Sequence, residues 1–380
     1  MALSFELSDE QITFQHRVRT IAKKEVTPLV EEYERKEAFP SQLFRILGEE
    51  GLLCLRCPRE YNGPGLDKVS ECIFVEEINR VCAGIGSSIM VHGGLATDPV
   101  LLCGSEELKR RYLPFAARGE KIGAFAMTEP NAGSDVGGIQ TTASRKGEGF
   151  LLSGTKTFIT NGTICDFVTV AATTDPGRRG EGMTLFVVDR GSPGFSVTRK
   201  LKKLGNLSSD TGELSFHDCY VPQEHVIGAG KGGEVLDQTL KSGRITYGAR
   251  STGIGQAALD ATFSFVTQWK RQGIPLNRSQ AIRCAVAEMA VVVETMRTMT
   301  YRGAWLYDQG RASMKDASVV KLFCTESVQQ IVEKAVALQK RAGLVKENPV
   351  QRFLRDARLL KIPEGTSEIQ HLIIAKELGL

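Results

Sequence analysis

The stretch Phe167-Val-Thr-Val-Ala-Ala172 is short, contains β-branched and aromatic residues, and is typical of a strand. Five more β-prone runs lie between residues 123 and 228, separated by Gly, Asp, Pro and Asn. These runs are residues 141–143, 150–152, 183–188, 195–198 and 214–216. Because no helical pattern lies between them, their spacing predicts an antiparallel sheet domain in the middle of the chain.

Helical patterns precede the predicted sheet. Ser8 and Gln11 stand at the spacing of a capping box, and apolar residues then recur at helical spacing at Phe14, Val18, Ile21, Ala22 and Val26. Proline and glycine residues divide further helical segments up to about residue 120. We therefore expect a helical domain before the sheet.

Helical periodicity returns after residue 234, in stretches such as 281–301 and 317–338, and predicts four or five helices. The glycine-rich segment 228–233 lacks P-loop spacing and is interpreted as a linker. The segment Gly253-Ile-Gly255-Gln-Ala-Ala258 has some features of a dinucleotide fingerprint, but no strand precedes it. We interpret its small residues as allowing close helix packing. The chain as a whole predicts an α+β fold with domains at 1–121, 122–230 and 231–380.

Composition excludes several classes of function. A net charge of +4 over 380 residues does not indicate nucleic acid as a partner. Nine scattered cysteines argue against a disulfide framework, and the lone pair Cys54 and Cys57 is interpreted as buried small residues rather than metal ligands. The first residues are acidic, and no apolar run approaches the ~20 residues of a membrane span. We expect a soluble intracellular protein without membrane insertion.

A short stretch near the end, residues 361–370, holds an acidic side chain in an unusual backbone setting. Glu364 lies between Pro363, which fixes the backbone, and Gly365, which frees it. This placement indicates that the position of the carboxylate matters.

Two further segments are candidates for ligand contact. Residues 126–138 are dense in small and polar residues, so backbone N–H groups and the hydroxyls of Thr128 and Ser134 can approach a planar or phosphorylated ligand. The alternative is a sharp surface turn. Residues 156–162 place Phe158 two positions before Thr160 at an expected strand end, a pattern that an ordinary strand and turn also explains.

Taken together, these segments resemble the acyl-CoA dehydrogenase family, with its short-chain, butyryl-type branch nearest. The resemblance extends over the whole chain and includes residues 203–214, Val221-Pro222, Ser242-Gly-Arg244 and Arg355-Asp-Ala-Arg358. It implies an N-terminal helical domain, a central antiparallel β-barrel or sandwich, and a C-terminal four-helix bundle. It also implies FAD as the cofactor, an acyl-CoA substrate, an electron-transfer flavoprotein as partner, and a homotetramer built as a dimer of dimers. The location would be the cytoplasm of a bacterium or, for a mature eukaryotic chain, the mitochondrial matrix.

The resemblance also assigns roles to individual residues. Contacts with the flavin and thioester would come from Phe125, Met127, Thr128 and Ser134, and contacts with the isoalloxazine ring from Phe158, Ile159 and Thr160. The adenine end of FAD in a neighbouring subunit would meet Gln280, Gln339 and Gly343, and its diphosphate and ribose would meet Thr366 and Glu368. Ser134, Arg244 and Gly365 would contact the substrate, with Arg244 holding coenzyme A.

The implied mechanism rests on Glu364. Its carboxylate would take the α-proton, its own N–H would steady the enolate, and the β-hydride would pass to flavin N5. Some relatives place the base at the position of Gly243, and glycine cannot do that chemistry. Substrate binding would dry the pocket and raise the pKa of the carboxylate.

Two alternatives remain open. Residues 269–273 read Trp-Lys-Arg-Gln-Gly where the family usually has Arg-x-x-Phe-Gly, with Lys270 or Arg271 as possible substitutes, and residues 339–345 depart from a glycine-rich motif. These departures favour a non-catalytic acyl-CoA-binding relative with a weakened FAD site. Alternatively, Asp98 would face the acyl pocket and act as a second acid or base on a cyclic acyl group. The interpretation preferred for Asp98 is a helix N-cap before Pro99.

Overall fold

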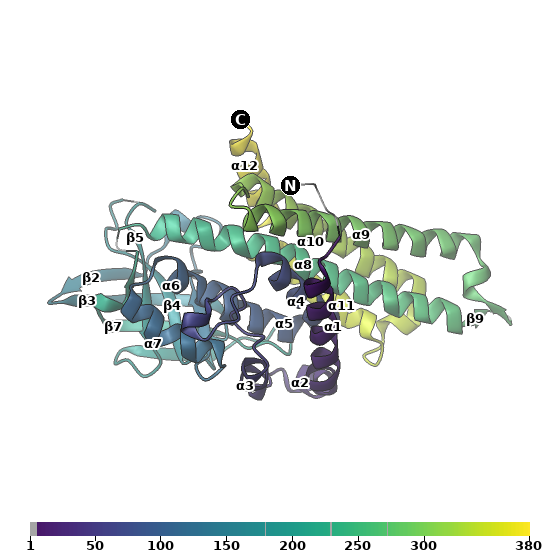
Figure 1. Cartoon of the computed structure of the whole chain (residues 1–380), viewed down its shortest axis with the longest axis horizontal. Helices are drawn as coiled ribbons and strands as arrows, with labels where there is room; N and C mark the ends of the chain where they lie inside the picture. The colour runs from purple at the N-terminus through teal and green to yellow at the C-terminus, as the bar shows by residue number, and fades with distance from the viewer. Residues whose placement is uncertain (1–5, 179, 229, 272) are drawn as a thin grey trace.

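The computed structural model describes residues 6–178, 180–228, 230–271 and 273–380. Figure 1 places the main sheet at one end of the molecule and the small hairpin that contains β9 at the other, with long helices running between them. The N-terminal helices pack beside the sheet and beside the long helices.

Two π-helical segments separate some of the N-terminal α-helices. The α-helices are α1 (Asp9–Ile21), α2 (Val30–Lys36), α3 (Gln42–Glu49), α4 (Lys68–Val81), α5 (Ala83–Met90), α6 (Asp98–Cys103) and α7 (Glu106–Ala117). The π-helical segments are η1 (Ala22–Val26) and η4 (Val91–Ala96), and the 3-10 turns are η2 (Thr27–Leu29) and η3 (Arg59–Tyr61). The predicted capping box is confirmed, because Ser8 Oγ accepts from Gln11 N at 3.2 Å and Gln11 Oε1 accepts from Ser8 N at 3.1 Å.

The predicted strands are confirmed as members of one sheet. Its strands are β1 (Gly123–Ala126), β2 (Thr142–Lys146), β3 (Gly149–Thr160), β4 (Phe167–Thr173), β5 (Met183–Asp189), β6 (Phe195–Lys200), β7 (Thr211–Pro222) and β8 (Val226–Ile227). The order is β6-β7-β3-β2-β4-β5-β8, with β1 paired to β4. The expected antiparallel pairing holds along β3–β7 and β4–β5, whereas β1 runs parallel to β4 and one residue pair of β2 meets β4 in parallel. The sheet is therefore mixed, which strand composition did not indicate.

The C-terminal part is helical, as predicted. Its α-helices are α8 (Gly232–Gln268), α9 (Gln280–Asp308), α10 (Met314–Gln339), α11 (Pro349–Arg358) and α12 (Ser367–Glu377). Short elements lie between them and near the sheet: β9 (Lys270–Arg271), β10 (Ile274–Pro275), η5 (Val136–Gly138), η6 (Gln223–His225), η7 (Leu276–Arg278), η8 (Lys340–Leu344) and η9 (Leu359–Lys361). None of the helices in the described part of the chain has the length and apolar character needed to cross a bilayer.

Helix α8 is the element around which the other parts pack, because it contacts α4, α9 and α10. The small residues near its centre allow this closeness, as predicted. A Cβ built on Gly253 would lie 2.3 Å from the carbonyl oxygen of Glu76 in α4, and one on Gly255 would lie 2.9 Å from Cε of Met296 in α9. The middle of α8 therefore lies directly against α4 and α9.

Candidate active site

Glu364 adopts a backbone conformation that is rare for a residue with a side chain. Its φ is +57°, and Gly365 after it has φ of +94°. Left-handed backbone at a non-glycine residue is strained and persists only where surrounding contacts hold it. The unusual setting expected from Pro363 and Gly365 is thus observed.

Buried side chains hold this turn by its carbonyl groups. Arg244 Nε donates to the carbonyl oxygen of Glu364 at 3.1 Å, and Gln370 Nε2 donates to the same oxygen at 3.0 Å. Lys321 Nζ donates to the carbonyl oxygens of Gly365 at 2.7 Å and Lys361 at 3.2 Å. Together they fix the backbone on both sides of the carboxylate.

The carboxylate itself is left without a partner. Glu364 Oε2 is buried and makes no hydrogen bond within the described residues. Burial raises the pKa of Glu364 to about 7, although the positive charges of Arg244, Lys68 and Lys321 oppose the shift. A carboxyl group with a pKa near neutrality can both accept and release a proton at physiological pH.

Gly243 makes room for this carboxylate. A Cβ built on Gly243 would lie 2.1 Å from Glu364 Oε2 and 2.6 Å from its Cδ, distances that atoms do not tolerate. Any side chain at position 243 would therefore displace the carboxylate. Glycine at position 243 therefore leaves space for the carboxylate of Glu364, and it also means that no second base stands there.

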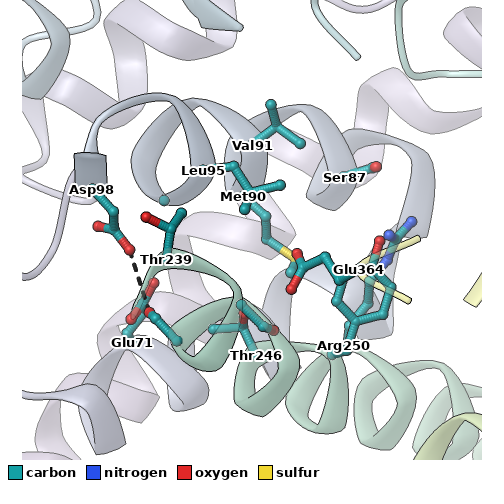
Figure 2. Close-up of a pocket in the computed structure, with 14 residues that line it drawn as sticks. Glu71, Ser87, Met90, Val91, Leu95, Asp98, Thr239, Thr246, Arg250 and Glu364 are labelled. Atoms are coloured by element: carbon teal, nitrogen blue, oxygen red, sulfur yellow. Dashed lines mark hydrogen bonds between the residues drawn. The ribbon is translucent and has the colours of Figure 1, made fainter. Parts of the chain in front are cut away.

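A narrow cavity begins at Glu364 and ends at Asp98. Its walls come from α4, α5, η4 and the first half of α8, and it encloses about 30 Å³ of space open to water-sized molecules. In Figure 2, Glu364 and Asp98 lie toward opposite ends, with Met90 and Leu95 between them. The π-helical turn of η4 gives Leu95 to the wall and leads directly into α6, where Asp98 stands.

The structure contradicts the N-cap interpretation of Asp98. The residue preceding α6 is Thr97, and no side-chain cap bond forms there. Asp98 is instead buried, accepts from Ser242 Oγ at 3.3 Å, and forms an ion pair with Arg56 through the same oxygen. The N-cap interpretation is therefore wrong, because a buried cation reached from another part of the chain draws the side chain into the cavity.

The two sheet segments singled out in the sequence lie side by side. Thr157 N donates to the carbonyl oxygen of Thr128 at 2.8 Å, and Lys156 Nζ donates to the carbonyl oxygen of Met127 at 2.8 Å. Lys156 also forms a buried ion pair with Glu129 at 2.7 Å. The segment after β1 and the end of β3 therefore form one rigid surface, to which Phe125 and Ile159 contribute buried side chains.

Phe158 projects from this surface. It has φ of +59° and a side chain that is 70% exposed, although β3 is otherwise largely covered. Thr160 is half-buried beside it, and Ser134 is exposed on the neighbouring loop. A strained, exposed aromatic ring next to a hydroxyl has the chemistry of a stacking platform for a planar ligand.

The residues assigned to the adenine end of FAD lie in another part of the molecule, at the ends of α9 and α10. Gln280 begins α9 and Gln339 ends α10, and the ion pair between Lys334 and Glu288 shows that these two helix ends are adjacent. Gln339 and Gly343 are buried, and Gln339 Nε2 lacks a partner in the described chain. This end of the bundle lies away from the main sheet (Figure 1).

Other predicted site residues have the following places. Thr366 caps α12, with Oγ1 accepting from Ile369 N at 3.4 Å, and Glu368 is exposed in its first turn. Arg244 is 5% exposed and bound to Glu364, so its proposed contact with coenzyme A stays a prediction. Gln272 and the side chain of Arg271 lie outside the described residues.

Sequence reasoning missed a group of buried charges at the Asp98 end. Arg56, Lys68 and Glu71 surround Ser242, which appeared only as part of a motif. The one signal was Arg56 itself, a lone charge in the apolar run of residues 52–57. The cysteines beside it are buried, as predicted, and no metal-binding cluster of His, Cys, Asp or Glu occurs in the described residues.

Comparisons with known proteins agree with this architecture. Models of the acyl-CoA dehydrogenase N-terminal, middle and C-terminal domains match residues 8–120, 124–219 and 230–379. A short-chain specific acyl-CoA dehydrogenase of Clostridium acetobutylicum is 36% identical over 99% of this chain and 100% of its own. The structure of butyryl-CoA dehydrogenase from Megasphaera elsdenii matches with a TM-score of 0.97, 33% identity and full coverage of both chains.

A third similarity is to a chain in a structure described as an electron transferring flavoprotein of Acidaminococcus fermentans. It has a TM-score of 0.97 and 33% identity, and covers 99% of each chain. With three domain models matched in order along the chain, a full-length relative and the same fold, the chain belongs to the acyl-CoA dehydrogenase family.

Proposed function

We propose that this enzyme removes hydrogen from Cα and Cβ of a short acyl-CoA and that Glu364 is the base. The observation that carries the proposal is the unpartnered carboxylate of Glu364, with a pKa of about 7, at one end of a narrow cavity. The α-proton moves to Glu364, and the thioester becomes an enolate whose charge lies on the carbonyl oxygen. The narrowness of the cavity favours a short acyl chain.

The backbone of Glu364 offers the donor that such an enolate needs. Its N–H makes no hydrogen bond to any described residue. Arg244 and Gln370 hold the carbonyl group of the same residue, in the next peptide plane, and so restrict the turn that carries this N–H before substrate arrives. A preorganised donor aimed at developing negative charge lowers the barrier without reorganisation.

The family is FAD-dependent, and the residues present fit that cofactor. Phe158 and Thr160 give a ring face and a hydroxyl at the sheet, and the orphaned amide of Gln339 offers a donor to a polar heterocycle. When bound, FAD supplies the acceptor for the hydride that leaves Cβ. Phe158 lies in β3 of the main sheet, whereas Gln339 ends α10 beside the start of α9, which follows the β9 hairpin at the opposite end of the molecule (Figure 1). We therefore infer that each cofactor is shared between two subunits, as in a dimer of dimers.

Electrons would leave through an electron-transfer flavoprotein. The structural similarity to a chain from a structure described by that partner supports this proposal. The supporting experiment is the reoxidation of substrate-reduced enzyme by such a flavoprotein, compared with reoxidation by oxygen alone.

Glu364→Gln tests the assignment of the base. The amide keeps the size of the side chain but cannot take a proton, so the rate of flavin bleaching by butyryl-CoA is expected to fall by about 10³-fold or more. The visible flavin spectrum should remain, which shows that cofactor binding is intact. Bleaching within tenfold of the wild-type rate would reject Glu364 as the base. A colourless wild-type protein that takes up no FAD would instead favour a non-catalytic acyl-CoA-binding relative.

A second candidate is dehydrogenation of a cyclic acyl-CoA, with Asp98 as a second acid or base. The observation in its favour is that Asp98 and Glu364 share one cavity. Burial raises the pKa of Asp98, while Arg56 opposes the shift. Asp98→Asn should then slow turnover of cyclic thioesters more than that of straight-chain ones, and equal effects on both would exclude this role.

A further inference from the structure

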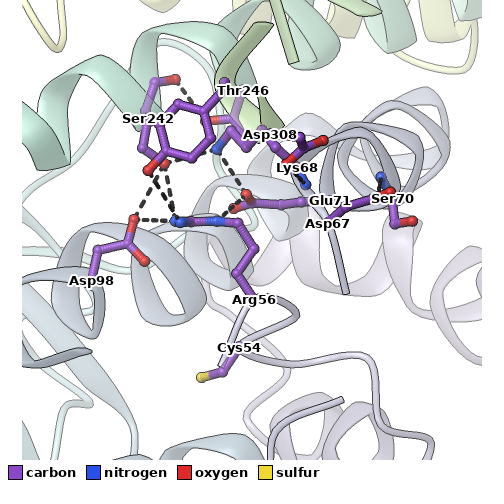
Figure 3. A network of polar contacts seen from close by, with 12 residues as sticks. Cys54, Arg56, Asp67, Lys68, Ser70, Glu71, Asp98, Ser242, Thr246 and Asp308 are labelled. Atoms are coloured by element: carbon purple, nitrogen blue, oxygen red, sulfur yellow. Dashed lines mark hydrogen bonds and ion pairs between the residues drawn. The ribbon is translucent and has the colours of Figure 1, made fainter. Parts of the chain in front are cut away.

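Glu71, Asp98 and Ser242 line the end of the cavity opposite Glu364. They belong to a charged cluster that also includes Arg56 and Lys68 (Figure 3). Arg56 Nε and Lys68 Nζ each donate to Glu71 Oε2 at 2.7 Å. Ser242 Oγ accepts from Arg56 Nη2 at 3.0 Å and from Lys68 Nζ at 2.8 Å, and donates to Asp98 Oδ2. A hydrocarbon pocket would end in apolar side chains, so this end is built for something else.

The charges of the cluster balance. Arg56 and Lys68 bring two positive charges, and Glu71 and Asp98 bring two negative ones. Both cations already point at carboxylate oxygens, and Arg56 also lies 5.6 Å from the ring centroid of Tyr307. A carboxylate on the substrate would meet only cations that are already paired with carboxylates of the protein. An ammonium group on the substrate would add an unbalanced charge in a buried site.

The three cluster residues that line the cavity, Glu71, Asp98 and Ser242, have free acceptors but no free donor. Glu71 and Asp98 each engage their partners through one oxygen, and no hydrogen bond from a described residue reaches Glu71 Oε1 or Asp98 Oδ1. The hydroxyl of Ser242 is fully used, as it donates once and accepts twice. Both carboxylate side chains line the cavity. This end of the cavity therefore presents hydrogen-bond acceptors to a bound acyl group.

We propose that the acyl group of the substrate carries a hydroxyl, which donates a hydrogen bond to Asp98 at the end of the cavity opposite Glu364. The inference rests on the proposed function, since it names the substrate class of the same site. The α and β carbons each lose a hydrogen in the reaction, so the hydroxyl stands on the γ carbon or beyond. A neutral donor satisfies the free oxygens and leaves the charge balance unchanged.

The test compares matched acyl-CoAs with the purified flavin-containing enzyme. Four-, five- and six-carbon acyl-CoAs are each prepared with a terminal hydroxyl, with a terminal fluorine, and unsubstituted. Fluorine is close to a hydroxyl in size but cannot donate a hydrogen bond. For at least one chain length, kcat/KM for flavin reduction should be about tenfold or more higher for the hydroxyacyl-CoA than for the fluorinated or the unsubstituted acyl-CoA. The dissociation constant measured on Glu364→Gln by the flavin spectral shift should be lowest for the hydroxyacyl-CoA.

A double variant separates recognition from general damage. Arg56→Met with Asp98→Leu removes one cation and one anion together, and Lys68 still pairs with Glu71. The ratio of kcat/KM for the hydroxyacyl-CoA to that for the unsubstituted acyl-CoA should then fall to about threefold or less, whatever the absolute rates of the variant. Arg80→Met with Asp260→Leu removes a comparable pair from the surface and should leave the preference unchanged.

Three results would overturn the inference. The first is a wild-type kcat/KM that, at every chain length, is no higher for the hydroxyacyl-CoA than for the fluorinated acyl-CoA. The second is a kcat/KM that is higher for the dicarboxylic acyl-CoA of equal length than for the hydroxyacyl-CoA. The third is a double variant that keeps the full preference for the hydroxyl. Failure of the proposed function looks different, because no acyl-CoA of any kind would then bleach the flavin, and the inference would fall with it.

Discussion

The cavity has a buried carboxylate at each end, and the two are treated in opposite ways. Glu364 is held through its backbone by Arg244 and Gln370, while its Oε2 has no partner and its pKa is raised to about 7. Asp98 is held through its side chain by Arg56 and Ser242. The difference teaches that a carboxylate that must move a proton is positioned through its main chain, which leaves its oxygens free.

Glu71 extends the comparison. Burial acts to raise its pKa, but the charges of Arg56 and Lys68 outweigh burial and lower it. Glu364 has cations nearby as well, yet none of them donates a hydrogen bond to its carboxylate, and burial prevails. Asp98 lies between these cases, because it contacts one cation, Arg56, and burial still raises its pKa. Of the three carboxylates, only Glu71 has two cations bonded to it, and only there do the cations outweigh burial.

The largest expected effect is on stability at the Asp98 end. Arg56→Met leaves Asp98 buried without its cation, which should lower the free energy of unfolding by about 3–5 kcal/mol. Urea unfolding followed by circular dichroism measures the change. Adding Asp98→Leu removes the stranded charge and should recover most of the loss. If the single and double variants are equally destabilised, the pairing does not hold this end together.

The next effect is on chemistry at the Glu364 end. Gly243→Ala places a methyl group against the carboxylate and should slow flavin reduction by about 10²-fold, because displacement of a reacting group by an ångström has effects of that size. Gly233→Ala, also in α8, has open space at its Cβ and is the matched control. Comparable rates in the two variants would show that Gly243 does not set the position of Glu364.

A smaller, graded effect is expected from pH. A base must be deprotonated to act, so kcat/KM for flavin reduction, which reports the free enzyme, should be high above pH 7 and fall by about tenfold per pH unit below it. Stopped-flow absorbance measures the profile. A rate that is constant between pH 5.5 and 8 would contradict the raised pKa of Glu364.

The smallest effect concerns the support of the turn. Lys321→Met removes donors to the carbonyl oxygens of Gly365 and Lys361 and a positive charge that stabilises ionised Glu364. Flavin reduction should slow by a few-fold, and the midpoint of its pH profile should move upward, since the charged form is less favoured. Lys334→Met, on the exposed part of the same helix, is the control and should leave the midpoint in place.

Much of the fold followed from local patterns. The β-prone runs, the capping box at Ser8 and the small residues near Gly253 are all short-range signals, and the structure confirms each. The parallel pairing of β1 with β4 was missed, because pairing depends on segments about 40 residues apart rather than on strand composition.

The candidate site divides in the same way. Glu364 was singled out because its proline and glycine neighbours mark an unusual backbone. Thr128 and Phe158 were singled out from the composition of their segments, and resemblance assigned their roles. The cluster around Asp98 was missed because Arg56, Glu71 and Ser242 are brought together from three distant segments. The assigned cofactor contacts and the domain boundaries stay predictions.

The most direct measurement of the central claim follows proton abstraction without the hydride step. Acetyl-CoA has α-hydrogens but no β carbon, so incorporation of deuterium from D₂O into its methyl group, read by mass spectrometry, reports the base alone. The account predicts enzyme-catalysed exchange that quickens as pD rises through about 7 and is at least about 10²-fold slower in Glu364→Gln. Exchange at the wild-type rate in Glu364→Gln would contradict the account.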